Sequence, residues 1–347
     1  MLFGKRLSVY LLSVLVLLSC AEEGVRKDST VRFFRRGKMA LEQKEYNNAI
    51  RYFDQAIQED SSFSAAWNNR GVAFFGVNEY TNAISDYTQA ITTDTTFWDA
   101  YFNRANAYYE IGEYKKAVDD LNKVAVQKPD SAVVFTNRGT ILQAMGNYTA
   151  ALSDFEKVLE LEPGNPIALV NKGSVFYNQN KLQEAQKLFE AALEIDVNQD
   201  FAYNNLGLVY LDQGETDKAI QFFNKAIELR PAAPYYLNNR GFAYLQLGEP
   251  EKAYKDLEKS LLYKGDNPLA LRNMGIYYLK NSDNNKAIQF LEKAMKIDSA
   301  TEELYWHLGN AYSQTGNKDK ACQTYKVGAE NGCMRCTELL QANCAEI

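Results

Sequence analysis

The feature that most constrains this chain is a repeat of 34 residues that runs through most of its length. Starting at Thr30, nine blocks follow one another without insertion and end at residue 335. Alanine stands at position 20 of all nine blocks. Glycine stands at position 8 of eight, with Ala105 in the remaining block. A repeat of this length is a small structural unit that cannot bury its own apolar face, so neighbouring units must stack.

The spacing inside each block predicts two helices. Apolar residues at positions 4, 8 and 11 fall on one stripe of a first helix, and those at positions 20, 24 and 27 fall on one stripe of a second. The small residues at positions 8 and 20 let two antiparallel helices approach closely, while large residues fill the space around them. Proline at position 32 of three blocks (Pro129, Pro163 and Pro231) stops the second helix. The sequence therefore predicts an all-α fold of stacked helix pairs.

This pattern resembles the tetratricopeptide repeat family over residues 30–335. The resemblance implies a right-handed α-solenoid superhelix of nine tandem helix-turn-helix repeats, whose first helices line a concave groove. Residues 334–345 have the pattern of a further amphipathic helix, which a solenoid needs to cover its open end. We assign residues 30–335 to the repeats and 336–347 to this C-terminal capping helix.

The N-terminus has the pattern of an export signal, assigned to residues 1–19. Lys5 and Arg6 precede an apolar run that is too short to span a bilayer. The run ends in LLSC, which resembles the lipobox of bacterial lipoproteins, so we expect cleavage before Cys20 and lipidation of its thiol. Residues 20–29 would form the lipidated end and a flexible tether. The alternatives are a stop-transfer anchor and an ordinary cleaved signal.

Charge and export narrow the range of partners. A net charge of −6 argues against a nucleic-acid surface, because phosphate binding needs clustered Lys and Arg, and we find no such cluster in the sequence. We expect a location in the envelope of a Gram-negative bacterium, at the outer membrane. The membrane would be contacted through the lipid anchor only.

Position 6 carries asparagine in seven consecutive blocks. On a helix it lies about 160° from position 8, so it points away from the packed face and toward the groove. A carboxamide suits the N–H and C=O groups of an extended peptide whatever its side chains. Such rows resemble the asparagine ladder of some tetratricopeptide superhelices, which holds the main chain of a bound peptide. The alternative is that these asparagines form hydrogen bonds between successive repeats. The seven are Asn69, Asn103, Asn137, Asn171, Asn205, Asn239 and Asn273.

Apolar side chains share this face in the C-terminal half, at positions 2 and 9. We expect Phe201, Tyr235 and Phe242 to receive apolar side chains of an extended ligand. The ligand main chain would be held in this half by the last four asparagines of the row. The alternative is that these aromatic side chains pack between repeats.

Positions 7 and 23 change together from block to block. Where position 7 is Leu206 or Met274, position 23 is Phe222 or Phe290. In four other blocks arginine at position 7 accompanies aspartate at position 23. This exchange predicts an ion pair between the two helices of a repeat, with a ligand-binding row of arginines as the alternative. The predicted pairs are Arg70 with Asp86, Arg104 with Asp120, Arg138 with Asp154, and Arg240 with Asp256.

The other four cysteines lie near the C-terminus: Cys322, Cys333, Cys336 and Cys344. In an exported chain an even number indicates two disulfides. Cys336 and Cys344 are too far apart on one helix to join each other, so Cys322 pairs with either Cys344 or Cys336. Pairing with Cys344 resembles the end of other exported repeat proteins and is the one we expect, together with Cys333–Cys336. A four-cysteine zinc site is the alternative, which an oxidising compartment disfavours.

No catalytic motif stands out. His307 is the only histidine, and it replaces asparagine at position 6 of the last block. We expect no enzymatic activity, cofactor or metal. The predicted function is a lipid-anchored envelope scaffold that binds a polypeptide in its groove, in secretion, outer-membrane assembly or surface-complex assembly. The alternative is a glycan-binding or peptidoglycan-associated accessory protein, whose aromatic side chains would stack on sugar rings.

Overall fold

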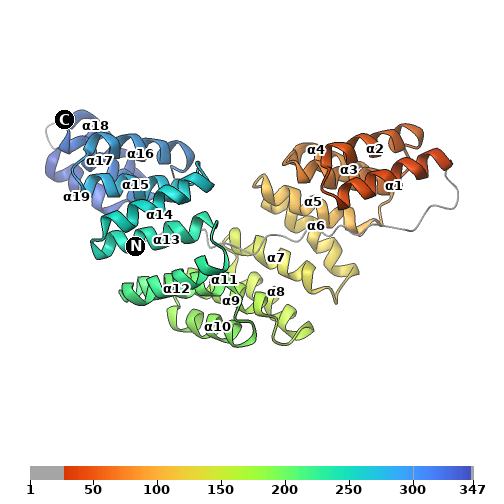
Figure 1. Cartoon of the computed structure of the whole chain (residues 1–347), viewed down its shortest axis with the longest axis horizontal. Helices are drawn as coiled ribbons and strands as arrows, with labels where there is room; N and C mark the ends of the chain where they lie inside the picture. Colours follow the sequence, from red (N-terminus) through yellow and green to blue (C-terminus); the bar gives the residue numbers. More distant parts are fainter. Residues whose placement is uncertain (1–26, 300, 345–347) are drawn as a thin grey trace. The chain divides into compact units, whose positions relative to one another are not determined.

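The computed structural model describes residues 27–299 and 301–344, and every regular element in them is an α-helix (Figure 1). The first helices of the nine blocks are α1 (Asp28–Glu42), α3 (Ser64–Gly76), α5 (Trp98–Glu110), α7 (Ala132–Ala144), α9 (Pro166–Asn178), α11 (Asp200–Asp212), α13 (Pro234–Leu247), α15 (Pro268–Lys280) and α17 (Glu302–Gln314). The second helices are α2 (Tyr46–Glu59), α4 (Tyr80–Thr93), α6 (Tyr114–Gln127), α8 (Tyr148–Leu161), α10 (Leu182–Ile195), α12 (Thr216–Leu229), α14 (Pro250–Tyr263), α16 (Asn284–Ile297) and α18 (Lys318–Glu330). The capping helix is α19 (Met334–Asn343).

The expected all-α fold of paired helices is confirmed, with small differences at its ends. The first helix begins at Asp28, ahead of the first block at Thr30. The capping helix begins at Met334 rather than at 336, because Cys333 is its N-cap and its sulfur accepts a hydrogen bond from the backbone N–H of Cys336.

Packing divides the chain into two compact units, which are described separately. The N-terminal unit comprises the described residues up to Val175, and the C-terminal unit begins at Phe176, within α9. In each unit the two helices of a block pack on each other, and a second helix packs on the following first helix, as α2 does on α3 and α12 on α13. Successive first helices also touch, as α3 with α5 and α13 with α15. We call this row of first helices the inner face of a unit.

The turn inside each repeat has one conformation throughout. Position 15 of every block has a positive φ, between 58° and 80°. Glycine adopts this left-handed conformation without steric cost, whereas other residues rarely do. Five blocks have glycine there and four do not, so the turn is imposed by the packing of the helix pair as well as by glycine. The four exceptions are Lys44, Asn78, Asn180 and Ser282.

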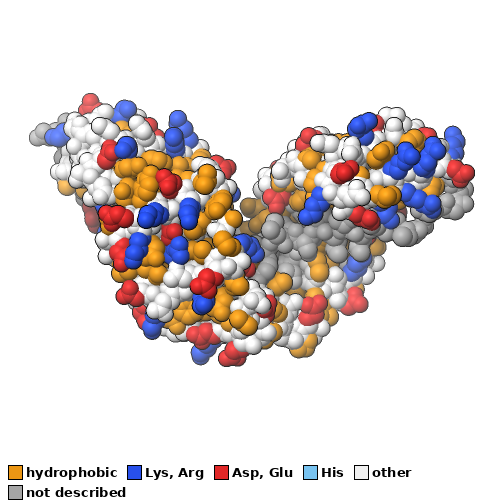
Figure 2. Space-filling view, in the orientation of Figure 1, with side chains coloured by type: hydrophobic (Ala, Val, Ile, Leu, Met, Phe, Trp, Pro, Cys, Tyr) orange, Lys and Arg blue, Asp and Glu red, His pale blue; other side chains and the backbone are white. Residues whose placement is uncertain are grey.

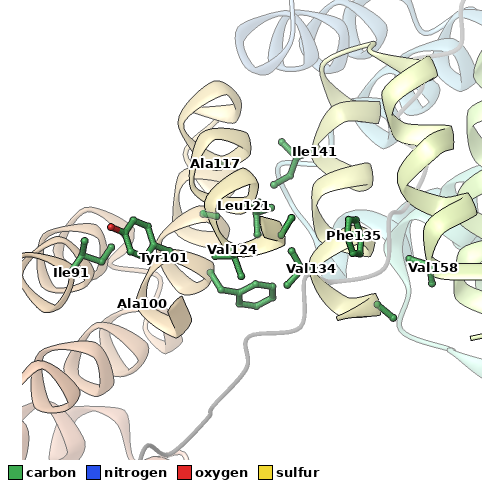
Figure 3. Close-up of a cluster of buried hydrophobic side chains, with 14 of the residues drawn as sticks. Ile91, Ala100, Tyr101, Ala117, Leu121, Val124, Val134, Phe135, Ile141 and Val158 are labelled. Carbon is green, nitrogen blue, oxygen red and sulfur yellow. The ribbon is translucent and has the colours of Figure 1, made fainter. Parts of the chain in front are cut away.

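The core of each repeat is built where position 8 meets position 24. A Cβ atom placed on Gly207 would lie 2.5 Å from Cε1 of Phe223, a ring that is fully buried. In the one block with alanine at position 8, Ala105, position 24 is the smaller Leu121. Figure 3 shows how Leu121 and Val124 of α6 pack with Val134 of α7 in the core of the N-terminal unit.

Tyr87, the residue at position 24 of the second block, carries a buried hydroxyl that forms no hydrogen bond in the described part of the chain. Its side chain is fully buried, yet its hydroxyl has no hydrogen-bond partner among the described residues. Burial raises the pKa of this hydroxyl well above its ordinary value, so it stays protonated at neutral pH. A buried hydroxyl without a partner is destabilising, because its hydrogen bonds to water are lost on folding without replacement.

We therefore expect Tyr87→Phe to raise the free energy of unfolding by about 1 kcal/mol. Phenylalanine is the residue at this position in other blocks, for example Phe53 and Phe155, so the ring is accommodated. Urea unfolding of the two proteins measures the difference. A loss of stability in the variant would show that the hydroxyl has a partner in solution.

Candidate functional site

The predicted asparagine row lies on the inner faces of both units. Its members are at most 3% exposed, except Asn239, which is partly exposed. In the N-terminal unit Asn103 Nδ2 donates to Asn68 Oδ1 at 3.1 Å, and Asn137 Nδ2 donates to Asn106 Oδ1 at 3.1 Å. These bonds join each first helix to the one before it, as in the inter-repeat alternative.

The C-terminal unit repeats this arrangement. Asn239 Nδ2 donates to Asn204 Oδ1, and Asn273 Nδ2 donates to Asn238 Oδ1, both at 2.9 Å. The acceptors stand at position 5 in three of the four bonds and at position 9 in the fourth, and sequence reasoning missed them. The signal for position 5 was present as Asn-Asn pairs. They occur at 68–69, 204–205 and 238–239.

The two units differ in how completely these carboxamides are paired. In the C-terminal unit Asn239 Oδ1 accepts from Asn238, and Asn273 Oδ1 accepts from the guanidinium of Arg272. Both the oxygen and the nitrogen of these two carboxamides are therefore bonded. To bind the main chain of a ligand, Asn239 and Asn273 would have to break the hydrogen bonds that they already form with neighbouring side chains.

In the N-terminal unit the inner face carries buried polar atoms that have no hydrogen-bond partner among the described residues. They belong to side chains that are at most 6% exposed, on four successive first helices. Three are amide donors and two are amide acceptors, and the sixth is a hydroxyl that can act as either. The atoms are Asn69 Nδ2, Asn103 Oδ1, Asn106 Nδ2, Thr140 Oγ1, Gln143 Oε1 and Asn171 Nδ2. We call them the unpaired row.

The aromatic residues predicted to contact a ligand have protein contacts of their own. Phe201 is 4% exposed, and its ring lies edge-on to Tyr236 and beneath the guanidinium of Arg230, which is 4.9 Å from the ring centroid. Tyr235 accepts a hydrogen bond from Lys264 Nζ at 2.9 Å. The ring of Phe242 lies 5.9 Å from the Arg272 guanidinium carbon. The contacts of Phe201 with Tyr236 and of Phe242 with Arg272 join successive repeats, as in the alternative, whereas those of Tyr235 with Lys264 and of Phe201 with Arg230 lie within one repeat.

The structure brings together all four predicted arginine–aspartate pairs. Each arginine donates through Nε and Nη2 to the two oxygens of its aspartate, at 2.6–2.9 Å, and the aspartates are 3–5% exposed. Burial alone would lower the pKa of Arg104, but the hydrogen bonds and the charge of Asp120 outweigh it and raise that pKa. The pairs hold the two helices of a repeat together.

A third arginine contact was not predicted. Nη1 of each paired arginine donates to position 25 of the preceding block, so the guanidinium also joins successive repeats. The acceptors are Asp54 for Arg70, Thr88 for Arg104, Asn122 for Arg138 and Asn224 for Arg240, at 2.7–3.0 Å. A hydrogen-bond acceptor at position 25 of eight consecutive blocks was the sequence signal for it. These arginines therefore stabilise the repeats and the contacts between them.

His307 lies on α17 beside Trp306, with the two ring centroids 4.1 Å apart. Burial lowers the pKa of His307 to about 3, and the positive charges of Arg272 and Arg335 add to this effect. The imidazole is therefore neutral in the folded protein at every pH near neutrality. Nothing about it indicates a general base, because a base that binds its proton only near pH 3 is a poor match for chemistry at pH 7.

The low pKa of His307 predicts a loss of stability in mild acid. Below pH 6.5 the unfolded chain binds a proton at this histidine and the folded chain does not, so the stability present above pH 6.5 is lost as the pH falls toward 3. We expect the free energy of unfolding to fall by about 1.5 kcal/mol more between pH 6.5 and 5 in the wild type than in His307→Asn. Denaturant titrations at both pH values measure this difference. Parallel pH profiles would contradict it.

At the C-terminus the structure bonds Cys322 to Cys344 and Cys333 to Cys336, with Cα atoms 5.7 Å and 5.2 Å apart. The first bond ties α18 to the end of α19.

The predicted lipidation site, Cys20, and the predicted signal peptide lie outside the described residues. Among the described helices none is long and apolar enough to cross a bilayer.

Comparison with protein families finds repeat models along most of the chain. Models described as tetratricopeptide repeat match residues 34–96, 98–131, 130–196 and 164–232. A model described as "Psidin, N-terminal TPR repeats region" matches residues 208–335. No curated protein matches the chain.

Solved structures show the same fold at low sequence identity. The chain is similar to the crystal structure of the APC/C hetero-tetramer Cut9–Hcn1, with a TM-score of 0.66 and 16% identity over 91% of this chain and 63% of that one. A tetratricopeptide repeat protein from Parabacteroides merdae matches with a TM-score of 0.50 and 19% identity, over 82% of this chain and 99% of that one.

Proposed function

Because this chain belongs to the tetratricopeptide repeat family, we propose that it is a scaffold that binds an extended polypeptide along the inner face of its N-terminal unit. The sequence predicted main-chain contacts along the whole asparagine row, and this proposal keeps those of the N-terminal unit, which contains the first four asparagines up to Asn171. The observation that carries the proposal is the unpaired row.

A buried polar atom without a partner costs about 1–3 kcal/mol. A row of such atoms is therefore unfavourable in the free protein and favourable in a complex that satisfies them. Buried polar groups in native proteins are otherwise nearly always bonded, so each exception calls for an explanation. These six atoms, on four successive first helices, would gain partners if their side chains turned toward a ligand that supplies donors and acceptors along the same line.

A polypeptide main chain fits this requirement. Every residue other than proline offers one N–H donor and one C=O acceptor, whatever its side chain. The row presents amide donors from Asn69, Asn106 and Asn171 and amide acceptors from Asn103 and Gln143. Packed helices lie about 8–10 Å apart, so one repeat corresponds to about three residues of an extended ligand. No charged side chain belongs to the row, and this favours the main chain over a particular sequence.

We further propose that the scaffold is held on the envelope by a lipid at Cys20. The support for this is the basic start, short apolar run and LLSC ending of residues 1–20. An exported location also agrees with the two cysteine pairs near the C-terminus, because disulfides persist outside the cytoplasm. Incorporation of radiolabelled palmitate tests the lipid, and Cys20→Ser should abolish it.

A glycan ligand is the second candidate, and the aromatic side chains of the C-terminal unit favour it. Tyr235 and Phe242 are partly exposed, and sugar rings stack on such side chains. An array of unrelated 15-residue peptides and an array of oligosaccharides separate the two candidates. Binding to many peptides of differing sequence is the result we expect. Binding to oligosaccharides alone would replace the polypeptide proposal with the glycan one.

A further inference from the structure

One exposed side of α1 carries a basic stripe, defined here as Arg32, Arg35, Arg36 and Met39. These residues stand at i, i+3, i+4 and i+7, which places them on one side of a helix. All four are exposed, and Met39 is 58% exposed. The buried side of the same helix is formed by Thr30, Phe34, Gly37, Ala40 and Leu41. Figure 2 shows Lys and Arg side chains gathered over the end of the N-terminal unit where α1 and α2 lie.

The stripe occupies positions that later repeats use for packing. Arg32 and Met39 stand at positions 3 and 10 of their block, and the residues at these positions in the next two blocks are fully buried: Ala66, Ala73, Ala100 and Ala107. No described element packs on this side of α1 as an earlier repeat would, so a polar surface here would be enough for solubility. Solubility does not explain why the surface is basic.

The charge of this helix is opposite to that of the rest of the protein. Residues 27–42 carry five basic and two acidic side chains, whereas residues 43–347 carry 30 basic and 40 acidic ones. An acidic protein with one basic end is oriented by a negatively charged surface, because that surface attracts the end and repels the remainder. The three arginines share a helix face rather than an unbroken run, so they do not stand out as a basic cluster in the sequence.

The proposed lipid anchor brings this end to such a surface. Cys20 is separated from Lys27 by six residues, which span at most about 25 Å when fully extended. From the charge, the helix geometry and the length of this tether, we propose that the basic stripe docks on the anionic phospholipid headgroups of the membrane that holds the lipid. Its position at the membrane rests on the proposed lipidation of Cys20, but its affinity for anionic lipid does not.

The chemistry of the stripe suits a headgroup layer. A guanidinium such as that of Arg32 or Arg36 can bond a phosphate through two N–H groups, and the exposed Met39 one turn further along can enter the boundary between headgroups and acyl chains. Attraction to an anionic leaflet acts within about a Debye length, roughly 8–10 Å at physiological salt. The lipid supplies the tether, and the stripe determines which side of the first repeat faces the membrane.

Vesicle co-sedimentation tests this proposal on the chain from residue 20 onward carrying Cys20→Ser, which keeps every described residue and removes the lipid. The vesicles are phosphatidylcholine alone or three parts phosphatidylcholine to one part phosphatidylglycerol. We expect binding to the anionic vesicles to be at least about tenfold tighter at low salt and to be lost at high salt. The variant Arg32→Gln/Arg35→Gln/Arg36→Gln should bind both kinds of vesicle equally weakly.

The matched control removes three positive charges from helices other than α1. Lys115, Lys255 and Lys326 are exposed on α6, α14 and α18, and their replacement with glutamine should leave anionic binding within about twofold. Circular dichroism confirms that the variants are folded, and Arg32→Gln alone should give a partial loss. Equal binding of the wild type to both kinds of vesicle would overturn the proposal, as would equal losses in the arginine and lysine variants. Peptide binding is measured without lipid, so either proposal can fail while the other stands.

Discussion

Asp120→Ala is expected to lower the free energy of unfolding by about 3–5 kcal/mol. Asp120 is 3% exposed and receives both Nε and Nη2 of Arg104, at 2.7 Å and 2.8 Å. The alanine variant leaves the guanidinium partly buried, with only the hydroxyl of Thr88 as a hydrogen-bond acceptor. The cost comes from this uncompensated charge rather than from the intrinsic strength of the pair. Guanidinium chloride unfolding measures it.

The chain supplies its own control for this experiment. In another block the same two positions are Leu206 and Phe222, and Leu206 is fully buried. The double variant Arg104→Leu/Asp120→Phe should therefore recover most of the stability that Asp120→Ala loses, because an apolar pair of suitable size can replace a buried ion pair. A loss in the double variant as large as in the single one would show that the ion pair itself stabilises the repeat.

Gly207→Ala is expected to destabilise the protein by about 1–2 kcal/mol. The new Cβ would lie 2.5 Å and 2.6 Å from two carbons of the Phe223 ring, which is fully buried, so the ring or the helix must shift. Overpacking of this kind costs about 1–3 kcal/mol. The higher helix propensity of alanine offsets about 1 kcal/mol at most. Thermal unfolding followed by circular dichroism measures the result.

The block with Ala105 and Leu121 indicates how this loss can be repaired. Gly207→Ala/Phe223→Leu reproduces that pair in the C-terminal unit and should be more stable than Gly207→Ala alone. As a control, Gly214→Ala adds a Cβ where no atom lies within 4 Å, so any loss there reflects its positive φ of 80° and not packing. Full stability of Gly207→Ala would mean that the contact between positions 8 and 24 is looser than the structure describes.

The fold could be predicted because the residue types that pack the two helices of a repeat recur at the same positions along the chain. Alanine at position 20 and a large residue at position 24 recur in all nine blocks, so a chance resemblance is excluded. The exchange of Arg104 and Asp120 for Leu206 and Phe222 even identified a contact between two helices. The contact between Arg104 and Asp120 is visible in the sequence because the residues at its two positions change together from block to block.

The inner face could be predicted only in part. The direction of position 6 follows from helix geometry, but the hydrogen-bond partner of each carboxamide depends on the distance between neighbouring first helices, which no spacing encodes. Asn239 and Asn273 are fully bonded while Asn69 and Asn171 are not, although all four stand at the same position. The sequence therefore predicted main-chain contacts for all seven asparagines alike, without separating those whose carboxamides are already paired from those that are not.

The most direct test of polypeptide binding at the N-terminal unit is to measure the stability and the peptide affinity of Thr140→Val together. Thr140 is 1% exposed, and its hydroxyl belongs to the unpaired row. Valine has nearly the same shape without the hydroxyl, so the free protein should gain about 1 kcal/mol while affinity for peptides bound on the array falls about fivefold.

Thr136→Val on the same helix is the matched control, because its hydroxyl already donates to the carbonyl oxygen of Ala132 at 2.9 Å. That substitution should leave peptide affinity unchanged. A gain in stability with a loss of affinity, seen at Thr140 and not at Thr136, is the result our account predicts. Unchanged affinity in Thr140→Val, with or without a change in stability, would contradict a ligand at the unpaired row.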